Sequence, residues 1–114
     1  MSNPSQRTQK IAKLNDMFRT AFGAYGGRIL QTHGINSMSQ ADQSKIRELV
    51  ETYTDFNEDS DPYFEHDFGK IVYKGEKIFW KIDYYDTNYE YGSDKPEDAT
   101  VTRRVMTIMK ADEY

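Results

Sequence analysis

The sequence predicts an α+β protein in which two helices pack on one face of a small, mainly antiparallel sheet. In the first half, apolar residues recur at helical spacing in two separate stretches. In the second half, residues rich in Ile, Val, Phe, Tyr and Trp alternate with polar ones, as in strands. Polar stretches containing Gly or Pro separate these segments. The predicted order is helix, strand, helix and then three strands (α-β-α-β-β-β).

The chain of 114 residues is the size of one domain, so we expect a single domain over 1–114, with residues 1–5 flexible. Nine Tyr, six Phe and one Trp indicate an aromatic core rather than a disordered chain. No apolar run approaches the roughly 18 residues that cross a bilayer, which predicts a cytoplasmic protein without membrane contact. The absence of cysteine excludes disulfides, zinc knuckles and thiol nucleophiles, and we expect no cofactor.

The first predicted helix covers residues 6–22 and begins after a capping residue, Ser5. Its apolar positions follow helical spacing: Ile11, Leu14, Phe18 and Ala21. The glycines at 23, 26 and 27 end the helix, because glycine lacks helix propensity. Residues 28–32 then form a short strand that Gly34 breaks.

The second predicted helix begins at Ser39, which with Asp42 forms a pair resembling a capping box. Its apolar face extends to Phe56: Ala41, Ile46, Leu49, Val50, Tyr53 and Phe56. The sequence NEDSDP follows as an acidic turn, in which Asn and Asp can bond their own backbone and Pro62 prevents helix continuation.

The strongest local pattern is a hairpin of two strands, 66–73 and 76–86, around Lys74-Gly75. In its second strand, the period of two directs one set of residues to the core: Ile78, Trp80, Ile82 and Tyr84. A polar connection over 87–100 leads to the last strand, 101–111. One face of that strand carries Arg103, Val105, Thr107 and Met109. We also expect Trp80 in the core and a bulge at Gly69.

The net charge of −4 is unevenly distributed along the chain. Residues 51–100 hold 5 Lys or Arg against 14 Asp or Glu, whereas residues 1–50 hold 7 against 3. An acidic block favours a basic partner, a cation or simply solubility. Because Lys and Arg are scattered and the aromatic segment is acidic, we expect no direct nucleic-acid binding.

Two segments carry a family resemblance: residues 61–69, DPYFEHDFG, and residues 78–86, IFWKIDYYD. Shorter matches lie at Leu14-Asn15-Asp16, Gly26-Gly27-Arg28 and the final RVMTIM. Together they resemble an uncharacterised bacterial family recorded as a domain of unknown function. The resemblance implies an accessory cytoplasmic protein found on chromosomes, plasmids and phages. It brings no activity, substrate or catalytic residue.

Glu65-His66-Asp67 is the candidate catalytic cluster, because an imidazole beside carboxylates can transfer protons. Asp83 is a further candidate, with Arg28 or Arg104 to hold an anionic substrate. In an extended strand, Glu65 and Asp67 would share one face and His66 the other, so the carboxylate partner of His66 would come from elsewhere. The alternative is a structural histidine at the start of the hairpin.

The acidic turn has oxygen-bearing residues at alternate positions, as in a calcium loop: Asp55, Asn57, Asp59 and Asp61. The pattern then fails, since Ser60 replaces the turn glycine and His66 stands where a bidentate Glu belongs. We therefore expect no metal site and a solvated acidic turn.

A second group joins carboxylates and phenols that suit recognition of a basic protein surface: Tyr63, Asp83, Tyr84, Tyr85, Asp86, Tyr89, Glu90 and Tyr91. The alternative is a sheet whose tyrosines pack with their hydroxyls in water. Our first hypothesis is a non-enzymatic modulator or inhibitor of a host protein, with a nucleic-acid-handling protein as one option. The second is a small enzyme at His66. We expect a monomer or homodimer.

Overall fold

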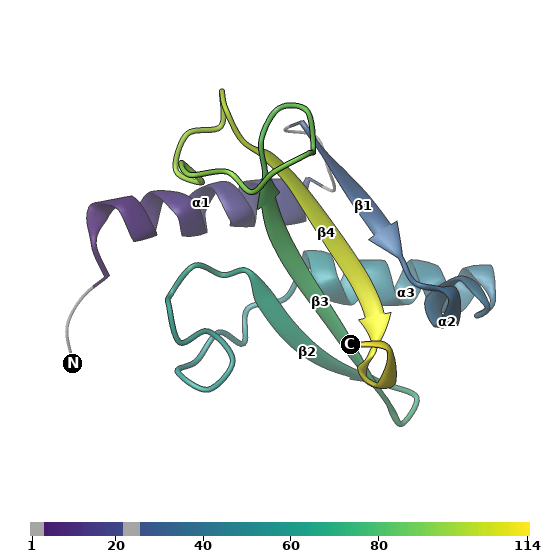
Figure 1. Cartoon of the computed structure of the whole chain (residues 1–114). Coiled ribbons are helices and arrows are strands. Elements are labelled where there is room, and N and C mark those ends of the chain that lie inside the picture. The colour runs from purple at the N-terminus through teal and green to yellow at the C-terminus, as the bar shows by residue number, and fades with distance from the viewer. Residues whose placement is uncertain (1–3, 22–25) are drawn as a thin grey trace.

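The chain adopts an α+β fold in which three α-helices accompany a four-stranded mixed sheet (Figure 1). This computed structural model describes residues 4–21 and 26–114, and the counts refer to them. The elements are α1 (Gln6–Thr20), β1 (Gly27–Gln31), α2 (His33–Asn36), α3 (Gln40–Glu51), β2 (Phe68–Tyr73), β3 (Glu76–Tyr85), β4 (Arg103–Lys110) and a 3-10 turn, η1 (Ala111–Glu113).

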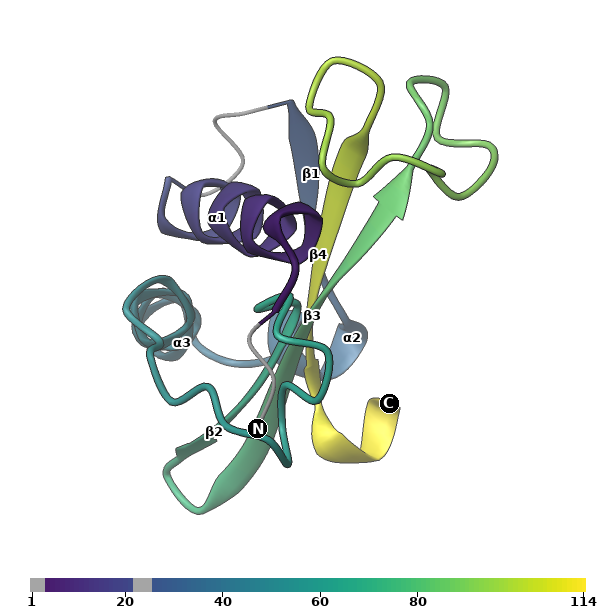
Figure 2. The same ribbon diagram turned by 90° about the vertical axis from the view of Figure 1, so that its left-hand side faces the viewer.

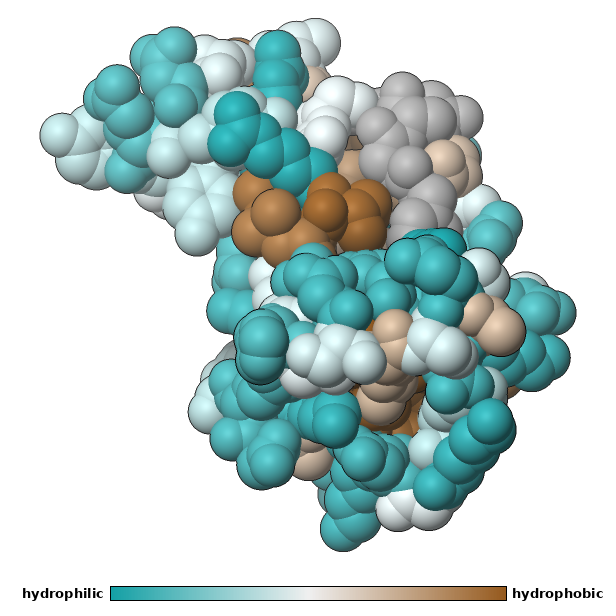
Figure 3. Space-filling model, turned by 90° about the vertical axis from the view of Figure 1, so that its right-hand side faces the viewer, coloured by the Kyte–Doolittle hydropathy of each residue, from teal (hydrophilic) through white to brown (hydrophobic). Residues whose placement is uncertain are grey.

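The sheet has the strand order β1-β4-β3-β2. Its β2–β3 and β3–β4 pairs are antiparallel and its β1–β4 pair is parallel, so the prediction of a mainly antiparallel sheet fits at this level. Figure 2 shows α1 and α3 on one side of the sheet, with η1 on the other. Seen from the β1 edge, a hydrophobic patch stands out among hydrophilic residues (Figure 3), and Leu30 of β1 is 50% exposed.

Both long helices begin where the sequence predicts. The Ser5 hydroxyl accepts the Thr8 N–H and the Ser39 hydroxyl accepts the Asp42 N–H, each at 3.1 Å. The predicted helix ends are wrong. α1 ends at Thr20, whereas the prediction extended it to residue 22. Phe22 and the glycine at 23 lie outside the residues that the structure describes.

α3 ends at Glu51, so Tyr53 and Phe56 follow the helix instead of continuing its face. They still pack on the core, and the Tyr53 ring lies edge-on to Trp80 at 5.5 Å. The sequence prediction missed α2, a single turn at the position of the expected strand break.

The predicted hairpin is confirmed. Lys74 and Gly75 have φ values of 50° and 80°, the left-handed pair that a tight two-residue turn requires. The first strand begins at Phe68 instead of residue 66, because His66 also has a positive φ. No bulge interrupts the strand, since Gly69 pairs directly with Trp80 in a continuous register, and that prediction was wrong.

The core lies between the sheet and the two long helices. Trp80 of β3 is fully buried, as are Phe18 of α1 and Ile46 of α3. Ile78 and Ile82 share the Trp80 face, as the period of two predicts. Within the described residues, no helix combines the length and apolar character that crossing a membrane requires.

Candidate functional site around His66

His66 lies in the segment between α3 and β2, in a backbone conformation that side chains rarely adopt. Phe64 and His66 have φ values of 60° and 56°. One buried carboxylate stabilises this turn: Asp61 Oδ1 accepts the N–H of Glu65 at 3.0 Å and that of His66 at 3.1 Å. The cost of the left-handed conformation is thus offset by hydrogen bonds that orient the histidine.

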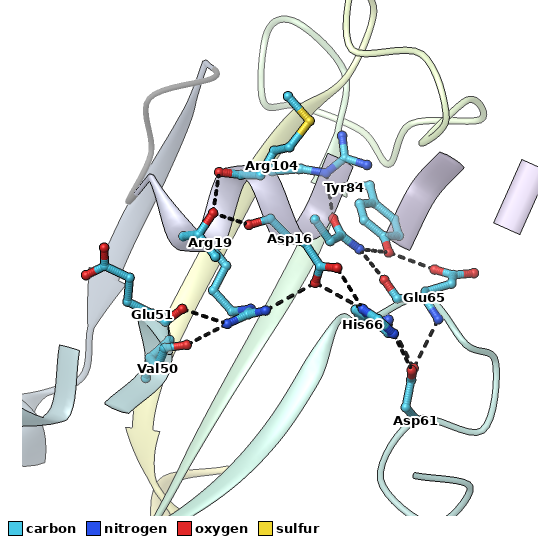
Figure 4. A network of polar contacts seen from close by, with 12 residues as sticks. Asp16, Arg19, Val50, Glu51, Asp61, Glu65, His66, Tyr84 and Arg104 are labelled. Carbon is cyan, nitrogen blue, oxygen red and sulfur yellow. Dashed lines mark hydrogen bonds and ion pairs between the residues drawn. The ribbon is translucent and has the colours of Figure 1, made fainter. Parts of the chain in front are cut away.

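Two carboxylates from different segments approach the His66 ring (Figure 4). Its Nδ1 lies 3.0 Å from both carboxylate oxygens of Asp16 on α1, and its Nε2 lies 3.7 Å from Oδ2 of Asp61. The ring stacks on Phe56, with centroids 3.9 Å apart and planes 2° from parallel. The side chain remains 31% exposed, so the imidazole is fixed in position but open to solvent.

Arg19 holds Asp16 from the other side. Its Nη2 donates to Asp16 Oδ1 at 3.1 Å, and its Nη1 donates to the carbonyls of Val50 and Glu51 at the end of α3. The guanidinium also lies 5.2 Å from the Trp80 ring and is almost completely buried. Arg19, which is itself bound to the end of α3, therefore positions Asp16 beside the histidine.

A second network lies beside the first and joins α1 to the sheet. Buried Asn15 accepts from Arg104 Nε at 2.6 Å and donates to the Glu65 carbonyl and to the Tyr84 hydroxyl. Tyr84 donates in turn to Glu65 Oε1 at 2.7 Å. Burial, followed by this hydrogen bond, raises the Tyr84 pKa, and burial lowers the pKa of Arg104.

His66 and Phe64 stand between two surface hollows. One has a volume of about 250 Å³, and its lining includes Phe56, Asn57, Glu58 and Asp61. The other, of about 340 Å³, lies along α1, and its lining includes Gln9, Ala12, Lys13 and Asp16. A small molecule in either hollow would touch the imidazole.

The other predicted catalytic residues lie apart from this ring. Glu65 belongs to the Tyr84 network, and Asp67 lines a different hollow of about 280 Å³ together with Lys81 and Asp83. The predicted shared strand face of Glu65 and Asp67 was wrong, because these residues precede β2. Burial, and then the charge of Glu65, raises the pKa of Asp67 to about 6. Asp83 pairs with Lys81 at 2.9 Å.

Asp16 and Arg19 were absent from the predicted catalytic set. A signal exists in the helix pattern: Asn15 and Arg19 occupy buried positions of α1 alongside Ile11 and Phe18. Polar residues on the buried face of a helix need internal partners. The expectation that the partner of His66 comes from elsewhere in the chain agrees with the position of Asp16.

The two arginines that were predicted to hold a substrate make contacts elsewhere in the molecule. Arg104 is 5% exposed and donates to Asn15 and to the Pro96 carbonyl at 2.6 Å. The Arg28 guanidinium lies 3.8 Å from the centre of the Tyr89 ring. Neither arginine reaches His66 through a contact among the described residues.

The predicted protein-binding residues are divided among four places. Tyr84 faces the helices, while Asp83 and Tyr85 occupy the opposite face of β3. Tyr63, 76% exposed, lies in the segment before His66. Three others form the loop after β3: Tyr89, Glu90 and Tyr91.

Asp86 stabilises that loop, because its Oδ1 accepts the backbone N–H groups of Asn88 and Glu90. Tyr91 is 72% exposed and, with Asp86 and Asp94, lines a hollow of about 420 Å³. The loop therefore presents carboxylates and one open phenol to solvent.

The residues of the calcium-loop pattern mainly form hydrogen bonds within their own turn and with the segment before His66. The Asn57 side-chain oxygen accepts the N–H groups of Asp59 and Ser60, and Asp61 is engaged with the backbone before His66. Asp55 offers its carbonyl to the Tyr53 hydroxyl. In residues 4–21 and 26–114, no group of three or more His, Cys, Asp or Glu side chains is placed to hold a metal ion.

The chain was compared with curated proteins, solved structures and protein families. Searches of the curated proteins and of the solved structures found no significant similarity. A protein-family comparison matches residues 31–113, which include α3, the His66 turn and β2 to β4 but not α1. Because the match covers more than half of the chain, this protein belongs to the family described as "Protein of unknown function (DUF3768)".

Proposed function

We propose that the protein is a small enzyme in which His66 acts as a general acid and base and Asp16 positions it. The observation that carries this proposal is the 3.0 Å contact between Asp16 and Nδ1 of a partly exposed imidazole. This is the second of the two sequence hypotheses, with Asp16 in the role assigned to the neighbouring carboxylates. The hydrogen bonds from the backbone N–H groups of Glu65 and His66 to the Asp61 carboxylate, at 3.0 and 3.1 Å, support a fixed ring orientation.

The proposed step is a proton transfer at Nε2. Asp16 accepts a hydrogen bond from the Nδ1–H group of the neutral ring. Nε2 is then free to take a proton from a water or hydroxyl in the adjoining hollow of about 250 Å³. The same proton then passes to the leaving group, so the imidazole returns to its first state. Because Asp61 and Glu58 line that hollow, an uncharged or cationic group fits it better than an anion.

The experiment measures hydrolysis of uncharged p-nitrophenyl esters by the whole protein. His66→Gln should lower kcat/KM at least about 100-fold, the usual contribution of general acid–base catalysis. The second histidine supplies a matched control, because His33 is exposed on α2 and His33→Gln should leave the rate unchanged. Asp16→Asn should lower kcat more than it changes KM, as expected of a positioning residue.

Several outcomes contradict the proposal. A wild-type protein without esterase activity would do so, as would equal rates for His66→Gln and the wild type. The fluorescence of buried Trp80, the single tryptophan, reports whether each variant keeps its fold.

A second candidate function is binding of a basic protein surface by the loop after β3. It is favoured by the exposure of Tyr91, at 72%, beside carboxylates that line the 420 Å³ hollow. Glu90→Lys combined with Asp94→Lys should abolish capture of one defined partner, identified by mass spectrometry. Glu58→Lys combined with Asp59→Lys is the control, because these two exposed substitutions change the charge equally on the His66 side. Retention of that partner by the double variant would contradict this function.

A further inference from the structure

The face of the sheet opposite α1 and α3, here the outer sheet face, concentrates positive charge. Strand register places five cations on it, one from β1, one from β2, two from β3 and one from β4: Arg28, Lys70, Lys77, Lys81 and Arg103. These residues are far apart in the sequence. Only one carboxylate of the four strands, Asp83, shares the face.

Most of these cations lack an acidic partner. Lys81 pairs with Asp83 at 2.9 Å, whereas the described part of the chain provides no ion pair for Arg28, Lys70, Lys77 or Arg103. Lys70, Lys77 and Arg28 are also exposed. Four of the five cations on the face therefore have no ion-pair partner among the described residues.

Aromatic rings alternate with these cations. Across β2 and β3, Phe68 pairs with Lys81 and Lys70 pairs with Phe79, so ring and ammonium groups alternate both along and across the strands. The Phe68 and Phe79 rings are 5.4 Å apart, and both contact Tyr114, which is 76% exposed.

The same combination recurs at the other edge of the sheet. The Arg28 guanidinium lies 3.8 Å from the centre of the Tyr89 ring, which orients this cation beside an aromatic surface. Tyr85, half-buried, stands on the same face at the end of β3, opposite Arg103. Cations thus lie on all four strands, and aromatic rings accompany them on β2, on β3 and beside Arg28 of β1.

We propose that the outer sheet face binds single-stranded nucleic acid. Unpaired cations match the charge of phosphates, and the neighbouring rings offer stacking surfaces to unpaired bases. An acidic protein would satisfy the cations but would make less use of the alternating rings. A duplex keeps its bases stacked inside and could not use the rings at all.

The proposal reverses the expectation drawn from the scattered basic residues of the sequence. Their dispersal along the chain disappears in the sheet, because every second residue of each strand shares a face. The net charge of −4 does not prevent binding, since charges more than about 10 Å away are largely screened at 0.1 M salt.

The test is fluorescence anisotropy of a labelled oligodeoxythymidine of about 20 nucleotides with the whole protein, at about 50 mM and about 200 mM salt. Lys70→Gln combined with Lys77→Gln should weaken binding about tenfold. It should also reduce the slope of log affinity against log salt by about 1.4, or about 0.7 for each lost phosphate contact. The matched control is Lys13→Gln with Lys45→Gln, exposed lysines on α1 and α3.

Removal of a ring separates stacking from charge. Tyr114→Ala should weaken binding about fivefold or more without changing the salt slope, because stacking contributes about 1–3 kcal/mol per base. Polyglutamate and a duplex of equal length are the competing probes. No binding of the oligonucleotide overturns the proposal, as does equal loss in the control. Polyglutamate or duplex binding as tight as that of the single strand overturns it as well.

Discussion

Gly69 and Trp80 face each other across β2 and β3, and their contact explains why a glycine stands in this strand. A Cβ atom added to Gly69 would overlap the indole of Trp80, including its Nε1 atom. Trp80 is fully buried and is packed edge-on by Tyr53 and Phe56, so the ring has no space into which it could move. The glycine provides room for the largest side chain of the core.

Gly69→Ala should therefore destabilise the protein by about 3 kcal/mol, at the upper end of the cost of overpacking a core. Urea unfolding followed by Trp80 fluorescence measures the change. Gly92→Ala is the control, since a Cβ there meets nothing closer than 3.8 Å, and it should change stability by less than about 0.5 kcal/mol. Equal effects of the two substitutions would contradict the packing argument.

Asp67 illustrates a carboxylate whose ionisation opposes folding. Its pKa rises from 3.8 to about 6 in the native state, chiefly through burial. The folded protein thus binds this proton more tightly than the unfolded chain, and the free energy of unfolding falls as pH rises through that interval. Asp67→Asn should stabilise the protein by about 1 kcal/mol at neutral pH, a value discounted for the partial exposure of the side chain.

The advantage of Asp67→Asn should shrink as the pH is lowered from about 6 to about 4, because the native carboxyl is then already protonated. Unfolding curves measured across that range provide the check. Asp83→Asn is a suitable comparison, because Asp83 lines the same hollow but is paired with Lys81 at the surface. A stabilisation by Asp67→Asn that does not vary with pH would count against the assignment.

At the scale of elements, Asn15 joins α1 to the rest of the fold. Its side chain forms hydrogen bonds with Arg104 of β4, with Tyr84 of β3 and with the Glu65 carbonyl. Asn15→Ala leaves the Nε of the buried Arg104 guanidinium without its acceptor and should cost about 3 kcal/mol. Tyr84→Phe should cost only about 1 kcal/mol, because Asn15 keeps its bonds to Glu65 and Arg104. Hydrogen exchange of α1 and urea unfolding would reveal both effects, and a larger loss in Tyr84→Phe would contradict this order.

The elements that sequence patterns predicted best are those that local chemistry determines. Ser5, Ser39 and the Lys74-Gly75 turn each act through neighbouring residues, and all three appear as expected. The end of α3 was predicted too late, because Tyr53 and Phe56 keep helical spacing yet reach the core from an irregular segment. Burial of a residue and its secondary structure are separate properties, and hydrophobic spacing reports mainly the first.

The candidate site was predictable only in part, because its contacts join distant segments. His66 was found from its acidic neighbours, yet its partner Asp16 stands fifty residues earlier on α1. The positive φ of His66 turned Glu65 and Asp67 away from the ring, and nothing in the local pattern predicts that conformation. Similarly, the cations of the outer sheet face are brought together by the order and the register of the strands, which join segments far apart in the sequence.

At the scale of the whole molecule, the beginning and the end of the chain form one unit. β1 pairs in parallel with β4, so Gly27 lies opposite Arg104. α1 covers the side of the sheet on which α3 also lies. η1 adds a further link, because the Glu113 carboxylate accepts the Gly34 N–H and the Thr32 hydroxyl. The fold is therefore completed by contacts between residues 27–34 and residues 103–114.

The boundary of the family match provides a test of this unity, because residues 31–113 omit α1 and nearly all of β1. A fragment of residues 31–114 would lose Phe18 and Ile11, both almost fully buried, together with the acceptor of Arg104. Removing a buried Phe or Ile side chain costs about 2–5 kcal/mol, so the two losses together are comparable with the 5–15 kcal/mol that stabilises a typical domain. The fragment should thus show no cooperative urea transition and an exposed Trp80 fluorescence spectrum, whereas Phe18→Ala in the full chain should unfold cooperatively at lower urea. A fragment that unfolds as cooperatively as the full chain would show that α1 and β1 are additions to an independently stable family domain.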